Sequence, residues 1–527
     1  MVPFAKRSPI GTRFRLLAVA CPLAVIGCDS AVELPRSTAV GEPTSAEART
    51  QLALRRIEEL DPLLNAVIAV DPTALDQARS LDRESAPRRP LHGMPTLVKD
   101  NIETAGPLPT TAGSLALIEN VTGRDAPLVA KLREAGAVIV GKANLSEWAN
   151  IRDSNSISGW SAVGGQTRNP HALDRNPCGS SSGSAVAVAA GMVPAAIGTE
   201  TDGSITCPAA VNGIVGMKPT VGLISRRHIV PISHSQDTAG PMTRTVRDAA
   251  MLLTVMAGTD AEDPATGEAD RHREDYTARL TPDALRGRRI GVLRFASGFG
   301  TDEPFEEALE TLRARGAILV DIDVFPGRQA IARNELIVLL TELKHGLNAY
   351  LATTPRAVKT RTLADVIAFN AAHADVEMPF FGQDLFEQAE ATTGIHSEEY
   401  RRAREISQRL AADGIDRLLA EHDLVALVAP TMSAAWPIDT VHGDVIRGGG
   451  AGSLAAVAGY PHLTVPMGHV RGLPVGLSFI GPKWSDGLIL ALGYAYEQAS
   501  RKRIEPRFAE SIEALPDVVR HLAPAVR

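Results

Sequence analysis

The stretch that most constrains how this chain can fold covers residues 178–204, where two turns rich in Ser and Gly enclose a run of small apolar residues. Residues 184–192 are almost all Ala, Val and Gly, which is too evenly apolar for a solvent-facing helix. We therefore expect a buried helix there, followed by a short strand over residues 193–199. The second turn contains Gly203 and several adjacent backbone N–H groups, an arrangement that can hold an oxyanion.

Two other interpretations of this stretch are less consistent with its residues. Flexible Gly/Ser linkers lack a long apolar insert of this kind. The residues from Gly179 to Gly183 also satisfy Gly-x-Ser-x-Gly, the nucleophile elbow of α/β-hydrolases, with Ser181 as the nucleophile. That elbow must follow a central strand, whereas residues 168–177 contain two prolines and several charged side chains. The sequence therefore disfavours both a linker and an elbow.

Three motifs in this region resemble the signature of the amidase signature family of serine amidohydrolases. They read Cys-Gly-Ser-Ser-Ser-Gly-Ser at 178–184, Gly-Thr-Glu-Thr-Asp-Gly-Ser-Ile-Thr-Cys-Pro at 198–208 and Gly-Ile-Val-Gly-Met-Lys-Pro at 213–219. The resemblance extends upstream to residues 93–101 and downstream to residues 458–468. It implies an α/β fold with a single catalytic domain, in which a large mixed β-sheet is flanked by helices on both faces.

The same resemblance implies a catalytic set at matching motif positions. The nucleophile would be Ser204, the bridging serine on a cis peptide bond would be Ser180, and the base would be Lys99. Further site positions are implied as well: oxyanion donors at the backbone N–H groups of Thr201, Asp202, Gly203 and Ser204, and a supporting hydroxyl at Ser181. We expect Asp100 to brace the turn that follows the lysine.

The residue types suit this chemistry. A serine hydroxyl is a weak nucleophile until a base takes its proton, and an amide reacts poorly until its oxygen is stabilised. A lysine with an ordinary pKa of about 10.4 is almost fully protonated near pH 7, so Lys99 can be a base only if its site lowers that pKa. A decrease of about three units corresponds to about 4 kcal/mol. Ser180 would relay the proton from Ser204 to Lys99.

Departures from the family pattern bear on the substrate. Many members have Arg where this chain has Thr206, so a substrate carboxylate would lack a cationic partner beside the nucleophile. Glu200 and Asp202 stand where the usual pattern has Asp and Gly. With residues 177–184, these make the chain resemble bacterial peptide amidases, which release ammonia from C-terminally amidated peptides. We therefore expect small-molecule or peptide amides without a charged carboxylate as substrates.

Two alternative functions remain. The signature is shared by the A-type component of tRNA-dependent amidotransferases, which releases ammonia from glutamine in the cytoplasm together with another protein. The other alternative is a catalytically silent envelope binding protein, although all three catalytic positions are filled. The sequence does not indicate an oligomeric state.

Charge and motif content exclude several classes of site and partner. The formal charge is −7, with 54 basic and 61 acidic residues and no long run of one sign, so nucleic acid is not an expected partner. None of the 13 histidines lies in a His-Glu-x-x-His motif and no Cys-x-x-Cys motif occurs, so we expect neither a metal nor a cofactor. Cys178 and Cys207 flank the two turns, and we expect them to be buried thiols. We expect Asp237 to be a turn residue and not a catalytic acid.

The N-terminus resembles an export signal of a bacterial lipoprotein. Basic residues precede a mostly apolar segment, 16–27, that is too short to span a bilayer. The ending Val-Ile-Gly-Cys resembles a lipobox, in which Cys28 is lipidated; ordinary cleavage after residue 20 is the alternative. We predict a signal over 1–28, a tether over 29–44, the catalytic domain over 45–510 and a tail over 511–527. The protein would be exported to the cell envelope or periplasm and would contact the membrane only through the lipid at Cys28.

Hydrophobic periodicity predicts alternating helices and strands along the catalytic domain. Strands are expected over 65–70, 95–99, 289–293, 317–320, 424–429, 463–466 and 474–480, and within the helix-then-strand segment 126–140. Helices are expected over 45–60, 304–315 and 487–500, the second with Pro304 at its first position, and at a start near Pro208. Residues 326–420 are expected to be mostly helical and to shape the entrance to the site.

Overall fold

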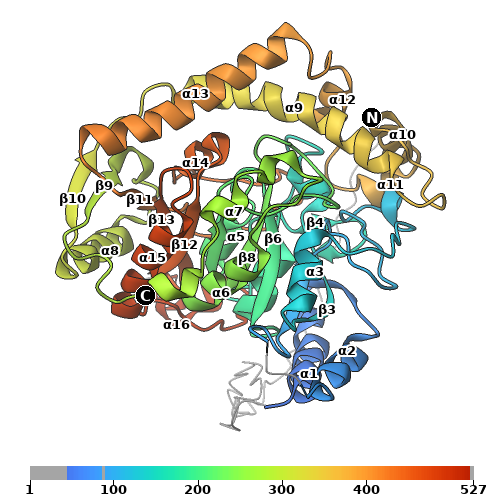
Figure 1. The fold of residues 1–527 in the computed structure, drawn as a ribbon, viewed down its shortest axis with the longest axis horizontal. Helices are drawn as coiled ribbons and strands as arrows, with labels where there is room; N and C mark the ends of the chain where they lie inside the picture. The colour runs from blue at the N-terminus through green and yellow to red at the C-terminus, as the bar shows by residue number, and fades with distance from the viewer. Residues whose placement is uncertain (1–43, 86–88, 523–527) are drawn as a thin grey trace, which may run out of the picture. The chain divides into compact units, whose positions relative to one another are not determined.

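The computed structural model describes residues 44–85 and 89–522, which form a single α/β domain (Figure 1). Its principal strands are β1 (Val67–Val70), β2 (Pro95–Lys99), β3 (Val138–Ala143), β6 (Ala195–Glu200), β7 (Val215–Lys218), β8 (Thr238–Thr243), β9 (Arg289–Leu293), β10 (Ile318–Ile322), β11 (Ala426–Pro430), β12 (His462–Val470) and β13 (Leu473–Ile480). They make one 11-stranded sheet, and β4 (Trp160–Ser161) pairs separately with β5 (Gly165–Gln166). The predicted large mixed sheet is confirmed.

The order of the strands across the sheet is β1-β3-β2-β6-β8-β7-β12-β13-β11-β9-β10. Strand β2 is parallel to both β3 and β6, and β9 is parallel to both β10 and β11. The other neighbours are antiparallel. Because β2 and β6 run in the same direction, their carboxyl ends, at Lys99 and Glu200, meet at one edge of the sheet.

Helices pack on both faces of the sheet. They are α1 (Ala46–Leu64), α2 (Ala74–Asp82), α3 (Pro127–Glu134), α4 (Ser182–Ala189), α5 (Thr206–Val211), α6 (Val246–Met256), α7 (Ala269–His272), α8 (Asp302–Ala314), α9 (Arg328–Ala352), α10 (Leu363–Ala372), α11 (Ala374–Glu377), α12 (Asp384–Glu390), α13 (Glu398–Glu421), α14 (Gly452–Ala458), α15 (Asp486–Ser500) and α16 (Pro516–Val519). Adjacent strand residues show the two faces: Leu97 belongs to a buried apolar cluster that includes residues of α1, α2 and α4, whereas Val98 belongs to a second cluster that includes residues of α3, α6 and α15. Burial on both faces explains why these strands are apolar throughout.

Helix α4 is the buried helix that the sequence predicts. Every residue of α4 is buried, because the Ala and Val side chains allow strand β6 and its neighbours to approach closely. At Gly183 a Cβ atom would lie 2.1 Å from the carbonyl oxygen of Ala66, so only glycine fits there. The helix therefore fixes the turn before it, which carries Ser180 and Ser181, against the sheet.

Helices α9 and α13 lie side by side across the top of Figure 1 and belong to the predicted helical region 326–420.

Two helices begin at other residues than the sequence predicts. Helix α8 begins at Asp302, so Pro304 occupies its third position, and α5 begins at Thr206, two residues before Pro208. In both cases the proline still lies in the first turn, where its missing N–H is tolerated.

Among residues 44–85 and 89–522, no helix is both long and apolar enough to cross a membrane. The predicted signal at 1–28, with Cys28, and nearly all of the predicted tether lie outside the described residues. Ser45 is the N-cap of α1, as its position in the sequence predicts: its side chain accepts a hydrogen bond from the N–H of Ala48.

Candidate active site

Lys99, at the carboxyl end of β2, is fully buried and reaches the first serine turn. Its Nζ lies 2.7 Å from Ser180 Oγ, 2.8 Å from Thr199 Oγ1 and 3.3 Å from the carbonyl oxygen of Thr199. Burial lowers the pKa of Lys99 to about 7, although the carboxylates of Asp237 and Glu200 counteract part of that effect. A substantial fraction of this amine is therefore neutral at pH 7.

Three oxygens surround Lys99 Nζ, and an ammonium can donate to all three. They also suit the neutral amine, which has two N–H donors and one lone pair. The two oxygens of Thr199 can accept both N–H groups, which leaves the lone pair for the hydroxyl proton of Ser180. Asn101 also donates to Thr199 Oγ1, at 3.0 Å, and so holds that threonine in place. Thr199 and Asn101 both lie within stretches that resemble the family, 198–208 and 93–101, but the sequence predicts no role for either.

The two serine turns are held together at the edge of the sheet. The peptide bond between Gly179 and Ser180 is cis, as the resemblance implies. The N–H of Ser181 donates to the carbonyl oxygen of Ser204 at 3.1 Å. The Ser181 hydroxyl also donates to the carbonyl of Thr199 and accepts from its N–H, at 3.0 and 3.2 Å. Ser181 thus ties the first turn to β6 and to the second turn.

Ser204 lies in the second turn, at the start of α5, and is 9% exposed. Gly203 has φ +80°, a conformation that favours glycine, and allows the chain to turn into the helix. The carboxylate of Glu200 accepts from the N–H groups of Ile205 and Thr206, at 2.8 and 2.9 Å. Because Glu200 satisfies those two donors, it fixes the turn that contains the predicted oxyanion residues Thr201, Asp202 and Gly203.

Asp237 braces this turn from the opposite side. Its carboxylate accepts from the Thr201 hydroxyl at 2.6 Å and from the N–H groups of Ile232 and Ser233, each at 2.9 Å. Burial raises the pKa of Asp237 to about 6, and the Thr201 hydroxyl counteracts part of that rise. The prediction that Asp237 is a turn residue is confirmed. Its contact with Thr201 and its effect on Lys99 were not predicted.

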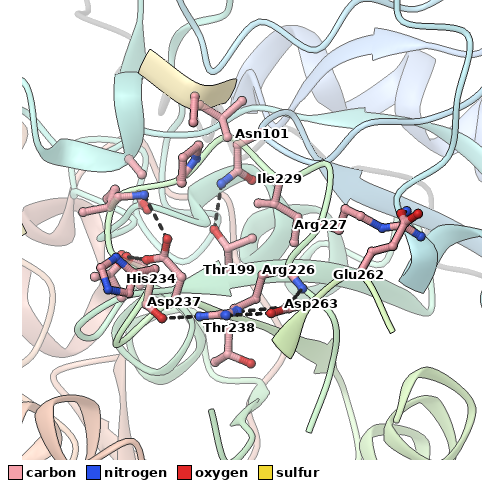
Figure 2. A pocket seen from close by; sticks show the side chains of 18 residues that line it. Asn101, Thr199, Arg226, Arg227, Ile229, His234, Asp237, Thr238, Glu262 and Asp263 are labelled. Carbon is pink, nitrogen blue, oxygen red and sulfur yellow. Dashed lines mark hydrogen bonds and ion pairs between the residues drawn. The ribbon is translucent and has the colours of Figure 1, made fainter. Parts of the chain in front are cut away.

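Two cavities meet at Ser204. The first, cavity A, has a volume of about 430 Å³ and contains Ser180, Thr199 and Asp237 in its wall (Figure 2). The second, cavity B, has a volume of about 510 Å³ and contains Gly179, Asp202 and Gly203. The residues that line both cavities are Ala149, Thr201, Ser204 and Ile232. A bound substrate can thus extend to either side of the serine.

Arginines lie at cavity A, and each is paired. Arg226 binds Asp263 with an N···O distance of 2.8 Å, and Arg227 pairs with Glu262 (Figure 2). Arg227 also pairs with Asp260 at 3.1 Å. These pairs hold the loop before β8 over the cavity. Across the part of the chain that the structure describes, no cluster of three or more His, Cys, Asp and Glu side chains could hold a metal ion.

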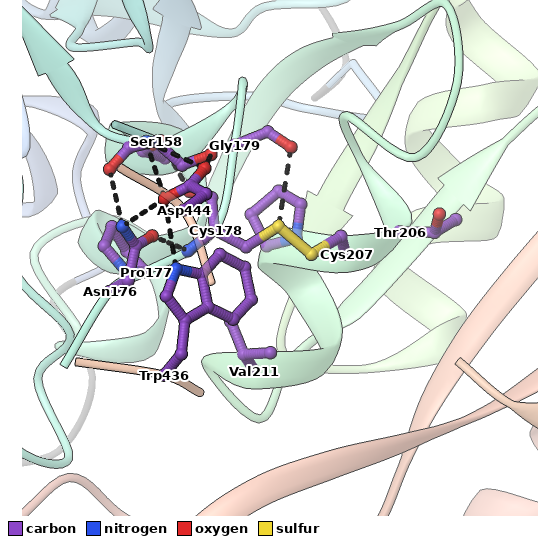
Figure 3. Close-up of a disulfide and its surroundings, with 12 residues drawn as sticks. Ser158, Asn176, Pro177, Cys178, Gly179, Thr206, Cys207, Val211, Trp436 and Asp444 are labelled. Atoms are coloured by element: carbon purple, nitrogen blue, oxygen red, sulfur yellow. Dashed lines mark hydrogen bonds between the residues drawn. A yellow bond between two sulfur atoms is a disulfide. The ribbon is translucent and has the colours of Figure 1, made fainter. Parts of the chain in front are cut away.

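Cys178 and Cys207 form a disulfide beside the two turns, so the expectation of buried thiols is wrong (Figure 3). Their Cα atoms are 6.1 Å apart, although 29 positions separate them in sequence. Folding brings the residue two positions before Ser180 to the residue three positions after Ser204, within the distance that a disulfide requires. The bond lines cavity B and links the two serine turns covalently.

Asp100 braces the turn after Lys99, as predicted. It accepts from the N–H of Thr111 at 3.1 Å and from the hydroxyl of the same residue. One of its oxygens lies 3.4 Å from Lys142 Nζ. Asp100 therefore holds the turn next to the site. None of its partners is a hydroxyl group that Lys99 contacts.

A protein-family model described as Amidase matches residues 48–490. The chain belongs to the amidase family. This amidase is therefore a hydrolase that acts on amide C–N bonds. The predicted membership of the amidase signature family is confirmed.

Several relatives support the assignment to the amidase family. A peptide amidase from Stenotrophomonas maltophilia has 53% sequence identity and a TM-score of 0.84, over 88% of this chain and 96% of that one. A protein of Arabidopsis thaliana named a probable amidase is 40% identical over 509 residues, which are 92% of this chain and 95% of that protein. The A-type component of the glutamyl-tRNA(Gln) amidotransferase of Halorhodospira halophila is 35% identical over 503 residues, covering 89% of this chain and 96% of that protein.

Proposed function

We propose that this amidase hydrolyses neutral carboxamides, C-terminal amides of peptides among them, through an acyl intermediate on Ser204. The observation that carries the proposal is the buried contact of 2.7 Å between Lys99 Nζ and Ser180 Oγ, beside a cavity that both serines line. The 53% identity with a peptide amidase supports the choice of substrate. Thr206, in place of an arginine, supports a substrate without a carboxylate at the nucleophile.

In the proposed mechanism, Ser204 Oγ attacks the amide carbonyl carbon. Its proton passes to Ser180 as the proton of Ser180 passes to the lone pair of Lys99. The carbonyl oxygen gains the negative charge and is held by N–H groups of residues 201–204. The C–N bond then breaks, and the proton returns through Ser180 to the departing amine. Water repeats the sequence on the acyl-serine and releases the acid.

The same contacts explain how Lys99 can be a base. Complete burial disfavours the ammonium form, and the oxygens of Thr199 can receive the two N–H groups of the neutral form. A pKa near 7 leaves the protonated amine acidic enough to return its proton to the leaving group. One lysine can therefore act first as base and then as acid near neutral pH.

The test is ammonia release from amidated dipeptides by the purified protein. We expect Ser204→Ala to lower kcat by on the order of 10⁴-fold or more, because the nucleophile is lost. The matched control is Ser184→Ala, since that buried serine donates only to the carbonyl of Ile197 in the structure and should leave most activity. A fluorophosphonate should label the wild type and not Ser204→Ala. Undiminished turnover in Ser204→Ala would exclude the mechanism, and an unlabelled wild type would favour a silent binding protein.

A second candidate is the ammonia-releasing component of an amidotransferase, since five such proteins are 35% identical to this chain. The two functions differ in substrate: the amidotransferase activity needs glutamine, whose α-carboxylate requires a cationic partner. Comparison of free glutamine with an amidated dipeptide as ammonia source decides between them. We expect the dipeptide amide to have the higher kcat/KM, and the reverse order would favour the amidotransferase.

We also propose that the protein is exported and held at the envelope by a lipid on Cys28, as the lipobox resemblance implies. The disulfide between Cys178 and Cys207 supports an oxidising compartment, since such bonds are rare in reducing cytosol. Expression in a bacterial host with a radiolabelled fatty acid should label the wild type and not Cys28→Ala. A label that persists in Cys28→Ala, or that is absent from both, would contradict the anchor.

A further inference from the structure

The charged side chains that line cavity B are acidic, and the nearest cation, Lys218, lies outside that lining. Among the described residues that line it, Asp202 and Asp444 are the charged side chains, and the lining contains no Lys or Arg. Asp444 is occupied, because its carboxylate accepts from Ser158, from Asn176 and from the indole N–H of Trp436. Asp202 is therefore the carboxyl group of cavity B that remains to be explained.

Asp202 lies two residues before the nucleophile and faces helices from the C-terminal half of the chain. Its carboxyl group hydrogen-bonds the side chains of Ser453, on α14, and Glu335, on α9. Glu335 is 7% exposed and accepts from Gln236 Nε2 at 2.9 Å, which also donates to the carbonyl of Thr201 at 3.3 Å. Two carboxyl groups thus meet beside the second catalytic turn without an Arg or Lys hydrogen-bonded to either.

An independent acceptor lies in the same cavity wall. His462 is fully buried, and its Nδ1 has no hydrogen-bond partner. Its Nε2 lies 2.7 Å from Ser478 Oγ, and that hydroxyl donates to Thr431 at 2.9 Å. Since the single proton of Ser478 is used on Thr431, Nε2 must carry the N–H that Ser478 accepts. Nδ1 is consequently a bare lone pair.

The ring stays neutral in this position. Burial lowers the pKa of His462 to about 3, and the nearby Lys218 contributes in the same direction. The edge of the ring that carries Nδ1 lies against Gly452, where a Cβ atom would come within 3.5 Å of Nδ1. Gly452 also lines cavity B, so the absence of a side chain there leaves the lone pair close to the cavity.

Acceptors of this kind select a donor-rich, cationic group. An alkylammonium group has three N–H donors and no acceptor, which complements the carboxylate of Asp202 in a cavity lined by no Lys or Arg. Two extended residues span at most roughly 7 Å. The α-ammonium of a dipeptide amide attacked at Ser204 therefore stays within that range of the nucleophile, and Asp202 is two residues away along the chain.

The proposed proton path places the two halves of the substrate. Ser180, which would protonate the departing amine, lines cavity A and not cavity B among the described lining residues. The amine would thus leave on the side of cavity A. The acyl half of the substrate would then lie in cavity B, with its far end toward Asp202.

We propose that cavity B binds the acyl half of the substrate and that Asp202 receives its α-ammonium group there. Glu335, which does not line cavity B, acts on that group through its contact with Asp202. The inference rests on the proposed function and narrows its substrate class to short peptide amides with a free amino terminus. Burial raises the pKa of Asp202 and of Glu335. At Asp202, Ser453, Glu335 and Lys218 counteract part of that rise, whereas Asp202 adds to the rise at Glu335. The pair therefore holds a proton that an incoming ammonium can replace.

The test compares Ala-Ala amide with N-acetyl-Ala-Ala amide at pH 7, where the free α-amino group is mostly charged. We expect the wild type to favour the free peptide by at least tenfold in kcat/KM, mainly through KM. Asp202→Asn and Glu335→Gln should each reduce that ratio by fivefold or more. The ratio is the decisive readout, since it cancels a general effect of Asp202→Asn on the oxyanion turn.

The matched control is Asp444→Asn, which removes a charge from the same cavity at a carboxylate whose partners are already in place. This variant should keep the preference for the free peptide. A wild-type ratio of one or less, ratios unchanged in Asp202→Asn and Glu335→Gln, or an equal loss in Asp444→Asn would each overturn the assignment. Hydrolysis of the acetylated peptide with no preference would refute this inference alone, whereas hydrolysis of neither peptide would contradict the proposed function.

Discussion

Two buried lysines on neighbouring strands have different surroundings. Lys99, on β2, contacts hydroxyl and carbonyl oxygens of Ser180 and Thr199. Lys142, on β3, is the register partner of Val98, the residue before Lys99, and is equally buried. Its Nζ donates to the carbonyl of Ile102 and the hydroxyl of Thr110 and lies 3.4 Å from the carboxylate of Asp100.

The difference is a directly paired carboxylate. Burial lowers the pKa of both lysines, but Asp100 acts against that effect at Lys142. An adjacent anion favours the ammonium form, so Lys142 is one half of a structural ion pair. Without such a partner, Lys99 is free to lose its proton. The comparison teaches that burial alone does not make a lysine a base.

The largest expected effect is a difference in kcat between variants of the two lysines. Lys99→Met should lower kcat by about 10³-fold or more, because the proposed base is lost while an apolar chain of similar length fills its place. Lys142→Met should keep kcat per folded molecule within about tenfold. Ammonia release by both variants, normalised to folded protein by circular dichroism, checks this. Equal losses in the two variants would remove the distinction.

The second largest effect is on the free energy of unfolding, which also differs between variants of the two lysines. Lys142→Met leaves Asp100 buried without its cation and should lower the free energy of unfolding by about 3–5 kcal/mol. Urea denaturation at pH 7 measures the change. The double variant Lys142→Met with Asp100→Asn should regain part of it, since both charges are then removed. A single variant as stable as the wild type would show that the ion pair contributes nothing.

Lys99→Met should have the opposite effect on stability. The unfolded lysine takes up a proton below a pKa of 10.5, whereas the folded one does so only below about 7. The folded state therefore loses stability as pH falls from 10.5 to 7, by up to about 5 kcal/mol at 1.36 kcal/mol per pH unit. Removal of the amine should recover part of this at pH 7 and almost none at pH 10.5. A variant less stable than wild type at both pH values would contradict the expectation.

The smallest expected effect is a shift in the acidic limb of the profile of kcat/KM against pH. Because Lys99 must be neutral, kcat/KM should rise as pH increases through about 7. The carboxylate of Asp237 raises the pKa of Lys99, so Asp237→Asn should move this limb to lower pH by less than about one unit. Asp416→Asn is a suitable control, since that carboxylate accepts from Tyr460, outside the two cavities. A limb that moves to higher pH in Asp237→Asn would contradict the assigned electrostatic effect.

Much of the fold could be predicted from local patterns. Strands β2 and β9 have the bounds that the apolar runs predict, and Ser45 caps α1 as expected. These features depend on neighbours in the sequence, so a period of two or 3.6 residues is enough to find them. The helix starts near Pro208 and Pro304 were misplaced by two residues, because proline is accepted anywhere in the first turn.

Contacts between distant segments could not be predicted in this way. The disulfide joins cysteines 29 positions apart, and nothing in their spacing shows that both turns meet at one edge of the sheet. The brace from Asp237 to Thr201 and the meeting of Asp202 with Glu335 depend on the same folding. Motif resemblance identified Lys99 and Ser180 as partners, and the structure brings them into contact.

The central claim is that the amine of Lys99 is neutral for a substantial part of the time at pH 7. NMR titration of the protein with ¹³C at lysine Cε measures this, with the Lys99 signal assigned by its absence in Lys99→Met. We predict a midpoint near pH 7 for that signal. A midpoint near the ordinary lysine value of about 10.4 would contradict the account.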